Sequence, residues 1–183
     1  MDVLVIGGPS AAGKTTLAKA IARALPGLSF VEGDELHPEA NVLKMERGDV
    51  LSDADRAPWL VAVAARALQQ LPAVVSCSAL KRTYRDVLRH ECGLAGASVK
   101  FVMLIADECA LRDRCARREG HFVKSSAFVQ DQLRVLELPE TAQERDCIVV
   151  DVSITPLEDA LACALRHAGW KATGVGPRVL PGD

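Results

Sequence analysis

Near the start of the chain stands the glycine-bounded segment Gly8-Pro9-Ser10-Ala11-Ala12-Gly13-Lys14-Thr15. It satisfies the pattern G-x-x-x-x-G-K-[ST], and it stands between a short β-branched run at residues 3–6 and a helical pattern at residues 17–25. Glycines let the backbone curl so that successive N–H groups face one point, and the N-terminus of the following helix adds partial positive charge there. A strand, this loop and a helix in that order predict a phosphate-binding loop.

Binding of a nucleoside triphosphate is the strongest inference from this loop. We expect the backbone from Gly8 to Thr16 to hold the phosphates, with Lys14 reaching the β- and γ-phosphates and the Thr15 hydroxyl binding Mg²⁺. The loop alone does not separate a motor, a GTPase and a small-molecule kinase, because all three share it. The chain has no evident N-K-x-D-like segment and no convincing Walker B strand. These observations favour an ATP-dependent metabolite kinase, with a GTPase as the alternative.

The composition is that of an ordinary folded protein with enough apolar residues for one core. The 183 residues are 49% hydrophobic and 25% charged, which fits one compact α/β domain better than two. We expect that domain over residues 1–170. Residues 171–183 are rich in Gly and Pro and are predicted to form a flexible tail.

Charge and cysteine content exclude several classes of function. A formal net charge of −2 and an aromatic content of 4% argue against nucleic acid as a partner. The six cysteines form no C-x-x-C pair, so no zinc site or redox dithiol is indicated. The start of the chain does not resemble a signal peptide, and no apolar run approaches the roughly 20 residues that span a bilayer. These features predict a cytoplasmic protein with no membrane association.

Short β-branched runs alternate with longer helical patterns along the chain. This alternation predicts a three-layer α/β fold, in which helices cover both faces of a central parallel sheet. The segment 51–60 also contains a helix start, with Ser52 or Asp53 as the N-cap. The predicted strands are residues 3–6, 28–31, 73–77, 99–105 and 148–150, and the predicted helices are residues 17–25, 84–89, 109–118 and 157–165.

Carboxylates follow the second predicted strand. Glu32, Asp34 and Glu35 come at its carboxyl end, where ligands bind in parallel sheets. A carboxylate at Asp34 can accept the proton of an attacking hydroxyl or orient Mg²⁺, and phosphoryl transfer needs both tasks. The alternative interpretation is a solvated acidic turn.

Cationic side chains follow the third and fourth predicted strands. Lys81 and Arg85 come just after the third strand, where either can serve as the counter-charge of an anionic substrate. Arg114 and Arg118 lie on a helix that we expect to end at Gly120, as a lid hinge would. These arginines are predicted to fold over ATP, or else to form a basic helix end favoured by the macrodipole.

Six segments, taken in order, resemble the gluconokinase family. Small shikimate and adenylate kinases share the phosphate loop and a lid, but the later segments are more specific. The chain departs from the usual pattern at Glu32, where aspartate is common, and at Ser52, where asparagine is common. The segments are the phosphate loop, G-D-x-L-H-P (33–38), Asn41 with Lys44-Met45, D-x-D-R-x-P-W-L (53–60), C-S-A-L-K-x-x-Y-R (77–85) and R-x-G-H-F (118–122).

The resemblance implies ATP:D-gluconate 6-phosphotransfer in a nucleoside-monophosphate-kinase-like fold, with a mobile lid at about residues 114–128 and often a homodimer. Another small sugar acid, a shikimate-like hydroxy acid, or a slow nucleotide-hydrolysing switch are the alternatives. By this resemblance, Lys14, Asp34 and Arg118 are catalytic, and Arg114 and Arg118 join the phosphate loop in binding ATP. Thr15 and Asp34 bind Mg²⁺, and the substrate contacts are Asp34, His37, Arg56, Ser78, Lys81, Arg85 and His121.

Overall fold

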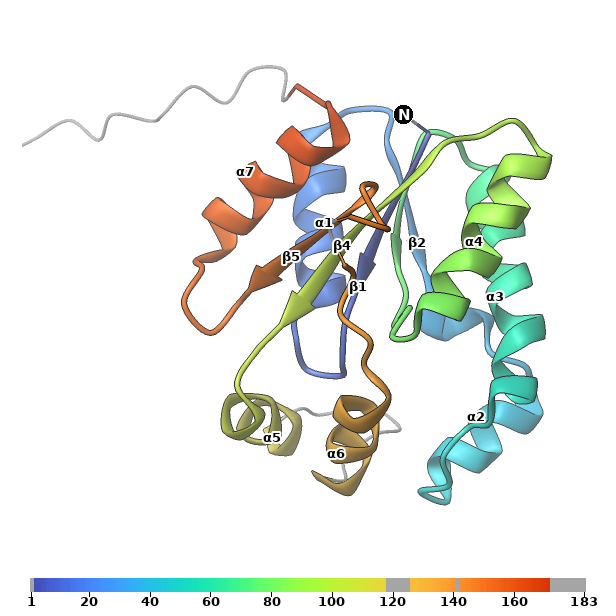
Figure 1. Ribbon diagram of the computed structural model, residues 1–183, viewed down its shortest axis with the longest axis vertical. Helices are drawn as coiled ribbons and strands as arrows, with labels where there is room; N and C mark the ends of the chain where they lie inside the picture. The colour runs from blue at the N-terminus through green and yellow to red at the C-terminus, as the bar shows by residue number, and fades with distance from the viewer. Residues whose placement is uncertain (1, 118–125, 141, 172–183) are drawn as a thin grey trace, which may run out of the picture.

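A parallel sheet forms the centre of the computed structural model, which describes residues 2–117, 126–140 and 142–171. The sheet has five strands in the order β2-β3-β1-β4-β5, and each adjacent pair is parallel (Figure 1). The predicted α/β class with a central parallel sheet is therefore confirmed. The strands are β1 (Val3–Gly7), β2 (Ser29–Glu32), β3 (Ala73–Ser76), β4 (Val99–Ile105) and β5 (Cys147–Asp151).

Helices cover both faces of this sheet. α1 (Lys14–Ala24) and α7 (Leu157–Ala168) lie on one face, and α3 (Asp53–Leu68) and α4 (Arg82–Leu94) lie on the other (Figure 1). Such a sheet is buried on both sides, which explains why its strands are nearly continuous apolar runs. The predicted three layers are thus present.

Side chains of β1 show how the two cores are separated. Leu4 and Ile6 pack in the cluster beneath α1 and α7, whereas Val3 and Val5 pack in the cluster beneath α3 and α4. Successive side chains of a strand point to opposite faces, so each core takes alternate residues.

The remaining helices lie near the carboxyl ends of the strands, at the bottom of Figure 1. They are the 3₁₀-helix η1 (Gly33–Leu36), α2 (Glu39–Glu46), α5 (Glu108–Ala116) and α6 (Ser126–Val135). The sequence predicted only a polar loop after β2, so η1 and α2 correct that prediction, and α6 was not predicted. The expected cap of α3 is confirmed, because the Ser52 hydroxyl accepts the Asp55 N–H at 3.2 Å and the Asp55 carboxylate accepts the Ser52 N–H at 2.9 Å.

Two predicted segments are covered only in part. Residues 118–125 of the predicted lid and 172–183 of the predicted tail lie outside the described residues. The domain boundary at residue 170 therefore stays a prediction.

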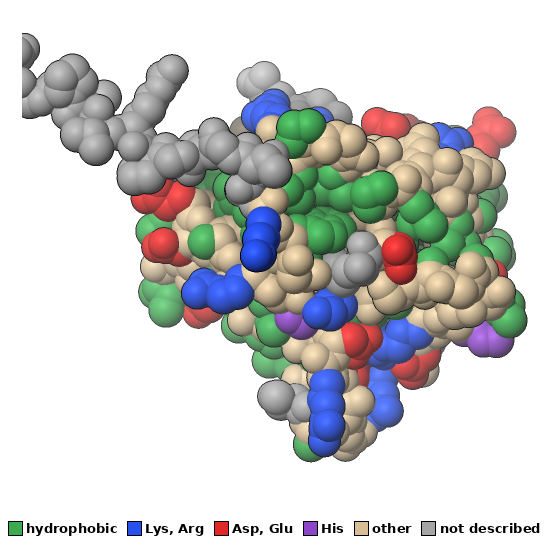
Figure 2. All heavy atoms as spheres, turned by 90° about the horizontal axis from the view of Figure 1, so that it is seen from above, with side chains coloured by type: hydrophobic (Ala, Val, Ile, Leu, Met, Phe, Trp, Pro, Cys, Tyr) green, Lys and Arg blue, Asp and Glu red, His purple; other side chains and the backbone are tan. Residues whose placement is uncertain are grey.

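Within the part of the chain that the structure describes, no helix is both long and apolar enough to cross a membrane. Acidic and basic side chains are mixed with hydrophobic ones on the face that Figure 2 shows.

Close backbone packing joins β2 to β3 where the site begins. A Cβ placed on Gly33 would come within 2.4 Å of the Ser76 carbonyl oxygen. Real Cβ atoms do not come so close, and a backbone carbonyl inside a sheet cannot move aside easily. Only glycine allows the chain to leave β2 at this position and continue into η1.

We expect Gly33→Ala to lower the free energy of unfolding by about 1–3 kcal/mol, because the added methyl group overpacks a rigid contact. Gly93→Ala is the matched control, since a Cβ at Gly93 of α4 meets no atom within 4 Å. That control should be neutral or stabilising by roughly 0.5–1 kcal/mol, the usual gain over glycine in a helix. Urea denaturation of both variants checks this, and equal stabilities would contradict the steric explanation.

Candidate active site

The phosphate loop occupies the carboxyl end of β1, between β3 and β4. Gly8 has φ +123° and Gly13 has φ +91°, both in the region that favours glycine. A Cβ on Gly8 would also lie 2.2 Å from the Leu104 carbonyl oxygen. No side chain caps the N-terminus of α1. The first N–H groups of α1 therefore face the loop, as an anion site requires.

Two contacts from distant segments support the loop. The Gly8 N–H donates to the Ser78 carbonyl at 2.9 Å, and the Ser10 N–H donates to the Gln132 side-chain oxygen at 2.6 Å. Gln132 belongs to α6 and is only 6% exposed. The sequence analysis missed Gln132, because nothing in the local pattern around α6 points to the loop.

Two adjoining clefts open over the loop. The smaller, of about 170 Å³, is polar, and the larger, of about 590 Å³, has apolar walls that include Leu17, Leu104 and Ile154. Ala11, Gly13, Thr16 and Arg114 line both. The smaller cleft adjoins the first N–H groups of α1, and the larger one offers mostly apolar walls. The smaller cleft is lined by Ser10, Ala11, Gly13, Lys14, Thr15, Thr16, Asp34 and Arg114.

The structure brings together Lys14, Asp34 and Arg114, since all three line the smaller cleft. The Lys14 ammonium donates to the Pro9 carbonyl at 3.0 Å, within the loop itself. Arg114 lies on α5 and donates to the Val152 carbonyl at 3.2 Å, which places it beside the 152–157 segment of the larger cleft. Arg118 and His121 lie outside the described residues, so their predicted roles stay predictions.

Oxygen ligands gather beneath the smaller cleft. The Thr15 hydroxyl donates to Glu32 Oε2 at 2.8 Å and lies 3.3 Å from the Ser76 hydroxyl. The other carboxylate oxygen, Glu32 Oε1, is buried and makes no hydrogen bond with the described residues. Such a set of hard oxygen donors next to phosphates suits Mg²⁺, which binds through one or two carboxylates and the substrate rather than a closed protein cage.

His37, which follows η1, stacks against Trp59 of α3. The two rings stack with centroids 4.1 Å apart and planes 12° apart, and the Trp59 N–H donates to the Gly33 carbonyl at 2.7 Å. Burial lowers the pKa of His37 to about 4, while Asp34 opposes this effect and Arg56 adds to it. His37 is therefore a neutral imidazole at neutral pH.

Arg56 and Ser78 are buried polar groups near the same end of the sheet. Arg56 is 5% exposed, lies over the Tyr84 ring at 5.8 Å and forms no ion pair with any described residue. The Ser78 hydroxyl is buried and finds no hydrogen-bond partner among the described residues. Buried polar groups normally have partners, so these two are suited to binding a ligand.

The two other predicted substrate cations are already paired. Lys81 contacts both carboxylate oxygens of Asp53 at 2.8 Å, and the Tyr84 hydroxyl also donates to Asp53. Arg85 is fully buried and makes a bidentate ion pair with Glu144 at 2.7 Å. The prediction that Arg85 contacts the substrate is at odds with this burial. Glu144 was missed because it stands far along the chain from Arg85.

The low pKa of His37 predicts a specific pH dependence. His37 should stay unprotonated down to about pH 5, because its folded pKa of about 4 lies below its ordinary value of 6.5. Between these values the unfolded chain binds more protons, so the free energy of unfolding falls as the pH drops through this window.

NMR titration of the His37 ring and urea denaturation at pH 7 and pH 5 check this expectation. His37→Gln is the control, since it retains a polar side chain but cannot titrate. The stability difference between wild type and this variant should shrink or reverse at pH 5. Protonation of His37 above pH 6 would contradict its burial in a neutral form.

Comparison with known proteins places this site in a family. A family model described as an AAA domain matches residues 3–139. A probable gluconokinase of Schizosaccharomyces pombe is 41% identical over 82% of this chain and 79% of its own length. The gluconokinase of Gluconobacter oxydans is 46% identical over 74% of this chain and 75% of its own.

A solved structure agrees with these relatives. The crystal structure of a gluconokinase from Sinorhizobium meliloti 1021 is 42% identical, covers 91% of both chains and superposes with a TM-score of 0.77. The fold, the phosphate loop and identity over most of the chain lead to one conclusion. The chain belongs to the gluconokinase family of P-loop kinases.

Proposed function

We propose that this protein transfers the terminal phosphoryl group of ATP to D-gluconate and forms 6-phospho-D-gluconate. Relatives named gluconokinase that match most of the chain support this activity. The observation that carries it is the cleft where Lys14 of the phosphate loop and Asp34 of the acceptor side line one cavity. A phosphoryl donor and a hydroxyl acceptor can meet there.

ATP occupies both clefts in this proposal. Its base lies between the apolar walls of the larger cleft, and its phosphates lie on the loop with Lys14 and Arg114 around them. Thr15, Glu32 and Asp34 are the residues that would hold Mg²⁺. The bound ion would neutralise charge on the phosphate oxygens.

Asp34 receives the proton in the transfer step. The C6 hydroxyl oxygen of gluconate forms a bond to the γ-phosphorus while the bond from that phosphorus to the bridging oxygen breaks. The hydroxyl proton passes to the Asp34 carboxylate, and Lys14 stabilises the charge on the moving group. These roles match the placement of both side chains along the smaller cleft.

Arg56 is suited to bind the carboxylate of gluconate. A buried guanidinium without a carboxylate partner is costly, and an anionic ligand removes that cost. Neutral His37 and the Ser78 hydroxyl can hydrogen-bond to sugar hydroxyls nearby. A cytoplasmic location, a homodimer and the lid roles of Arg118 and His121 accompany this proposal as predictions.

Substrate preference is the direct test. With ATP and Mg²⁺, we expect gluconate to give the highest kcat/KM in an ADP-release assay that also includes shikimate, glycerate and other sugar acids. Phosphorus NMR should place the phosphate on C6. A preference for another acid would identify a different kinase, and slow ATP hydrolysis that ignores every acid would favour the nucleotide switch.

Asp34→Asn tests the proton acceptor. The amide retains the size of the side chain but cannot take the proton, so kcat should fall about 10²- to 10⁴-fold, with ATP binding unchanged by calorimetry. The neighbouring exposed residue provides the control Glu35→Gln, which should leave kcat near the wild-type value. Near-normal turnover of Asp34→Asn would remove Asp34 from this role.

A further inference from the structure

The loop that follows β3 has an unusual backbone. Ala79 has φ +43°, a left-handed conformation that residues with a Cβ rarely adopt. Ala79 is fully buried, so the conformation belongs to a packed segment rather than an exposed turn. The neighbouring Ser78 lies at the site, since its carbonyl accepts the Gly8 N–H and its buried hydroxyl finds no hydrogen-bond partner among the described residues. Strain of this kind persists only where surrounding contacts enforce it.

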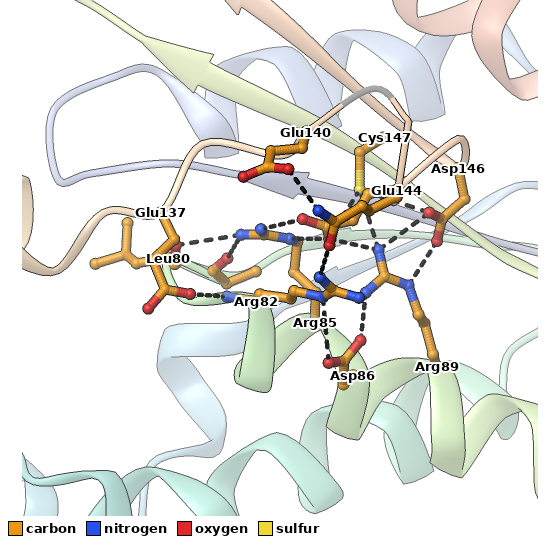
Figure 3. A network of polar contacts seen from close by, with 12 residues as sticks. Leu80, Arg82, Arg85, Asp86, Arg89, Glu137, Glu140, Glu144, Asp146 and Cys147 are labelled. Carbon is orange, nitrogen blue, oxygen red and sulfur yellow. Dashed lines mark hydrogen bonds and ion pairs between the residues drawn. The ribbon is translucent and has the colours of Figure 1, made fainter.

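Arg85 supplies those contacts. Its Nη1 donates to the Ala79 carbonyl at 3.1 Å and to the Leu80 carbonyl at 3.2 Å, from the first turns of α4. Its Nε and Nη2 donate to the two carboxylate oxygens of Glu144, each at 2.7 Å (Figure 3). One planar guanidinium thus joins the two loop carbonyls to a carboxylate from a distant part of the chain. Only an arginine has donors in this arrangement.

Glu144 is itself fixed in place. It is 3% exposed, and Arg89 of α4 donates to its Oε2 at 2.7 Å while also binding Asp146 (Figure 3). Arg85, followed by Arg89, holds the pKa of Glu144 down at about 2, so the carboxylate stays charged. The same segment touches the loop again, since the Glu137 N–H donates to the Leu80 carbonyl at 2.9 Å and its carboxylate accepts the Arg82 N–H at 2.7 Å.

We propose that Arg85 and Glu144 are positioning residues that hold Ala79 in its left-handed conformation and thereby keep Ser78 and Lys81 at the acceptor site. The inference rests on the proposed function, because it concerns the binding of gluconate. Arg85 cannot be the counter-charge of the substrate, since Glu144 neutralises it in the interior. Its effect passes through the backbone of the loop instead.

If Arg85 and Glu144 only stabilised the fold, replacing them would lower the stability of the protein without a selective effect on the loop after β3. Buried ion pairs add little net stability compared with apolar residues, and breaking one lowers stability wherever it lies. A positioning role adds a selective effect on the loop. If Arg85 no longer binds the two carbonyls, Ala79 should relax to negative φ, because the left-handed conformation disfavours a Cβ by on the order of tenfold in population. Ser78 would then move with it.

The test uses Arg85→Lys and Glu144→Gln in the full chain. Lysine keeps a positive charge but cannot bind two carboxylate oxygens and two carbonyls together. We expect each variant to raise the KM for gluconate about tenfold and to leave the KM for ATP within about twofold. Ala79→Gly, combined with either variant, should restore most of the gluconate affinity, because glycine tolerates positive φ without Arg85.

A second measurement does not involve gluconate. Hydrogen exchange of the amides of residues 79–81 should be faster in Glu144→Gln than in wild type, and Arg89→Lys is the matched control. Arg89 touches Glu144 but neither loop carbonyl, so this control should lower stability without changing loop exchange or gluconate KM.

Three outcomes would overturn the proposal: gluconate KM within twofold of wild type in both variants, no rescue by Ala79→Gly, or failure of both variants to fold. Absence of gluconate turnover in wild type would refute the proposed function alone. In that case unchanged exchange of residues 79–81 in Glu144→Gln would overturn the positioning role, and faster exchange would support it.

Discussion

The close approach of backbone segments at the carboxyl end of the sheet is the constraint on which the site depends. Gly8 lies where a Cβ would clash with the Leu104 carbonyl, and Gly33 lies where a Cβ would clash with the Ser76 carbonyl. These contacts bring the ends of four strands together. Because the helix α1 starts there without a side-chain cap, its first N–H groups lie at the cleft that Asp34, just after β2, also lines.

Pairing of charges divides the cations of this region into two groups. Lys81, Arg85 and Arg89 are each paired with carboxylates of the protein. Arg56 is buried and has no carboxylate partner among the described residues. A buried cation without an anionic partner is energetically costly, which is the basis for proposing Arg56 as the group that binds the gluconate carboxylate. The arginines of this region therefore differ in whether a carboxylate of the described residues pairs with them.

Part of the fold and site followed directly from the sequence. The five strands, α1, α7 and the start of α3 were predicted within a few residues, and α4 in part, because buried parallel strands are continuous apolar runs and the helices have a regular apolar spacing. The phosphate loop, Asp34 and Arg114 were also predicted and line one cleft. In contrast, η1, α2 and α6 were missed. Their segments are short, and they are held by tertiary contacts such as the hydrogen bond of Gln132 with Ser10 and the burial of Val129 in the core.

The phosphate loop, the parallel sheet and the resemblance to gluconokinases can be recognised from the sequence, because each depends on residue types at short, regular spacing. Which cations are paired inside the protein depends on tertiary contacts. Arg85 and Glu144 are 59 residues apart, and their pairing arises when the chain after α6 packs against α4. A local motif shows that an arginine is present. Burial and the carboxylate that reaches it decide whether it faces a ligand or the interior.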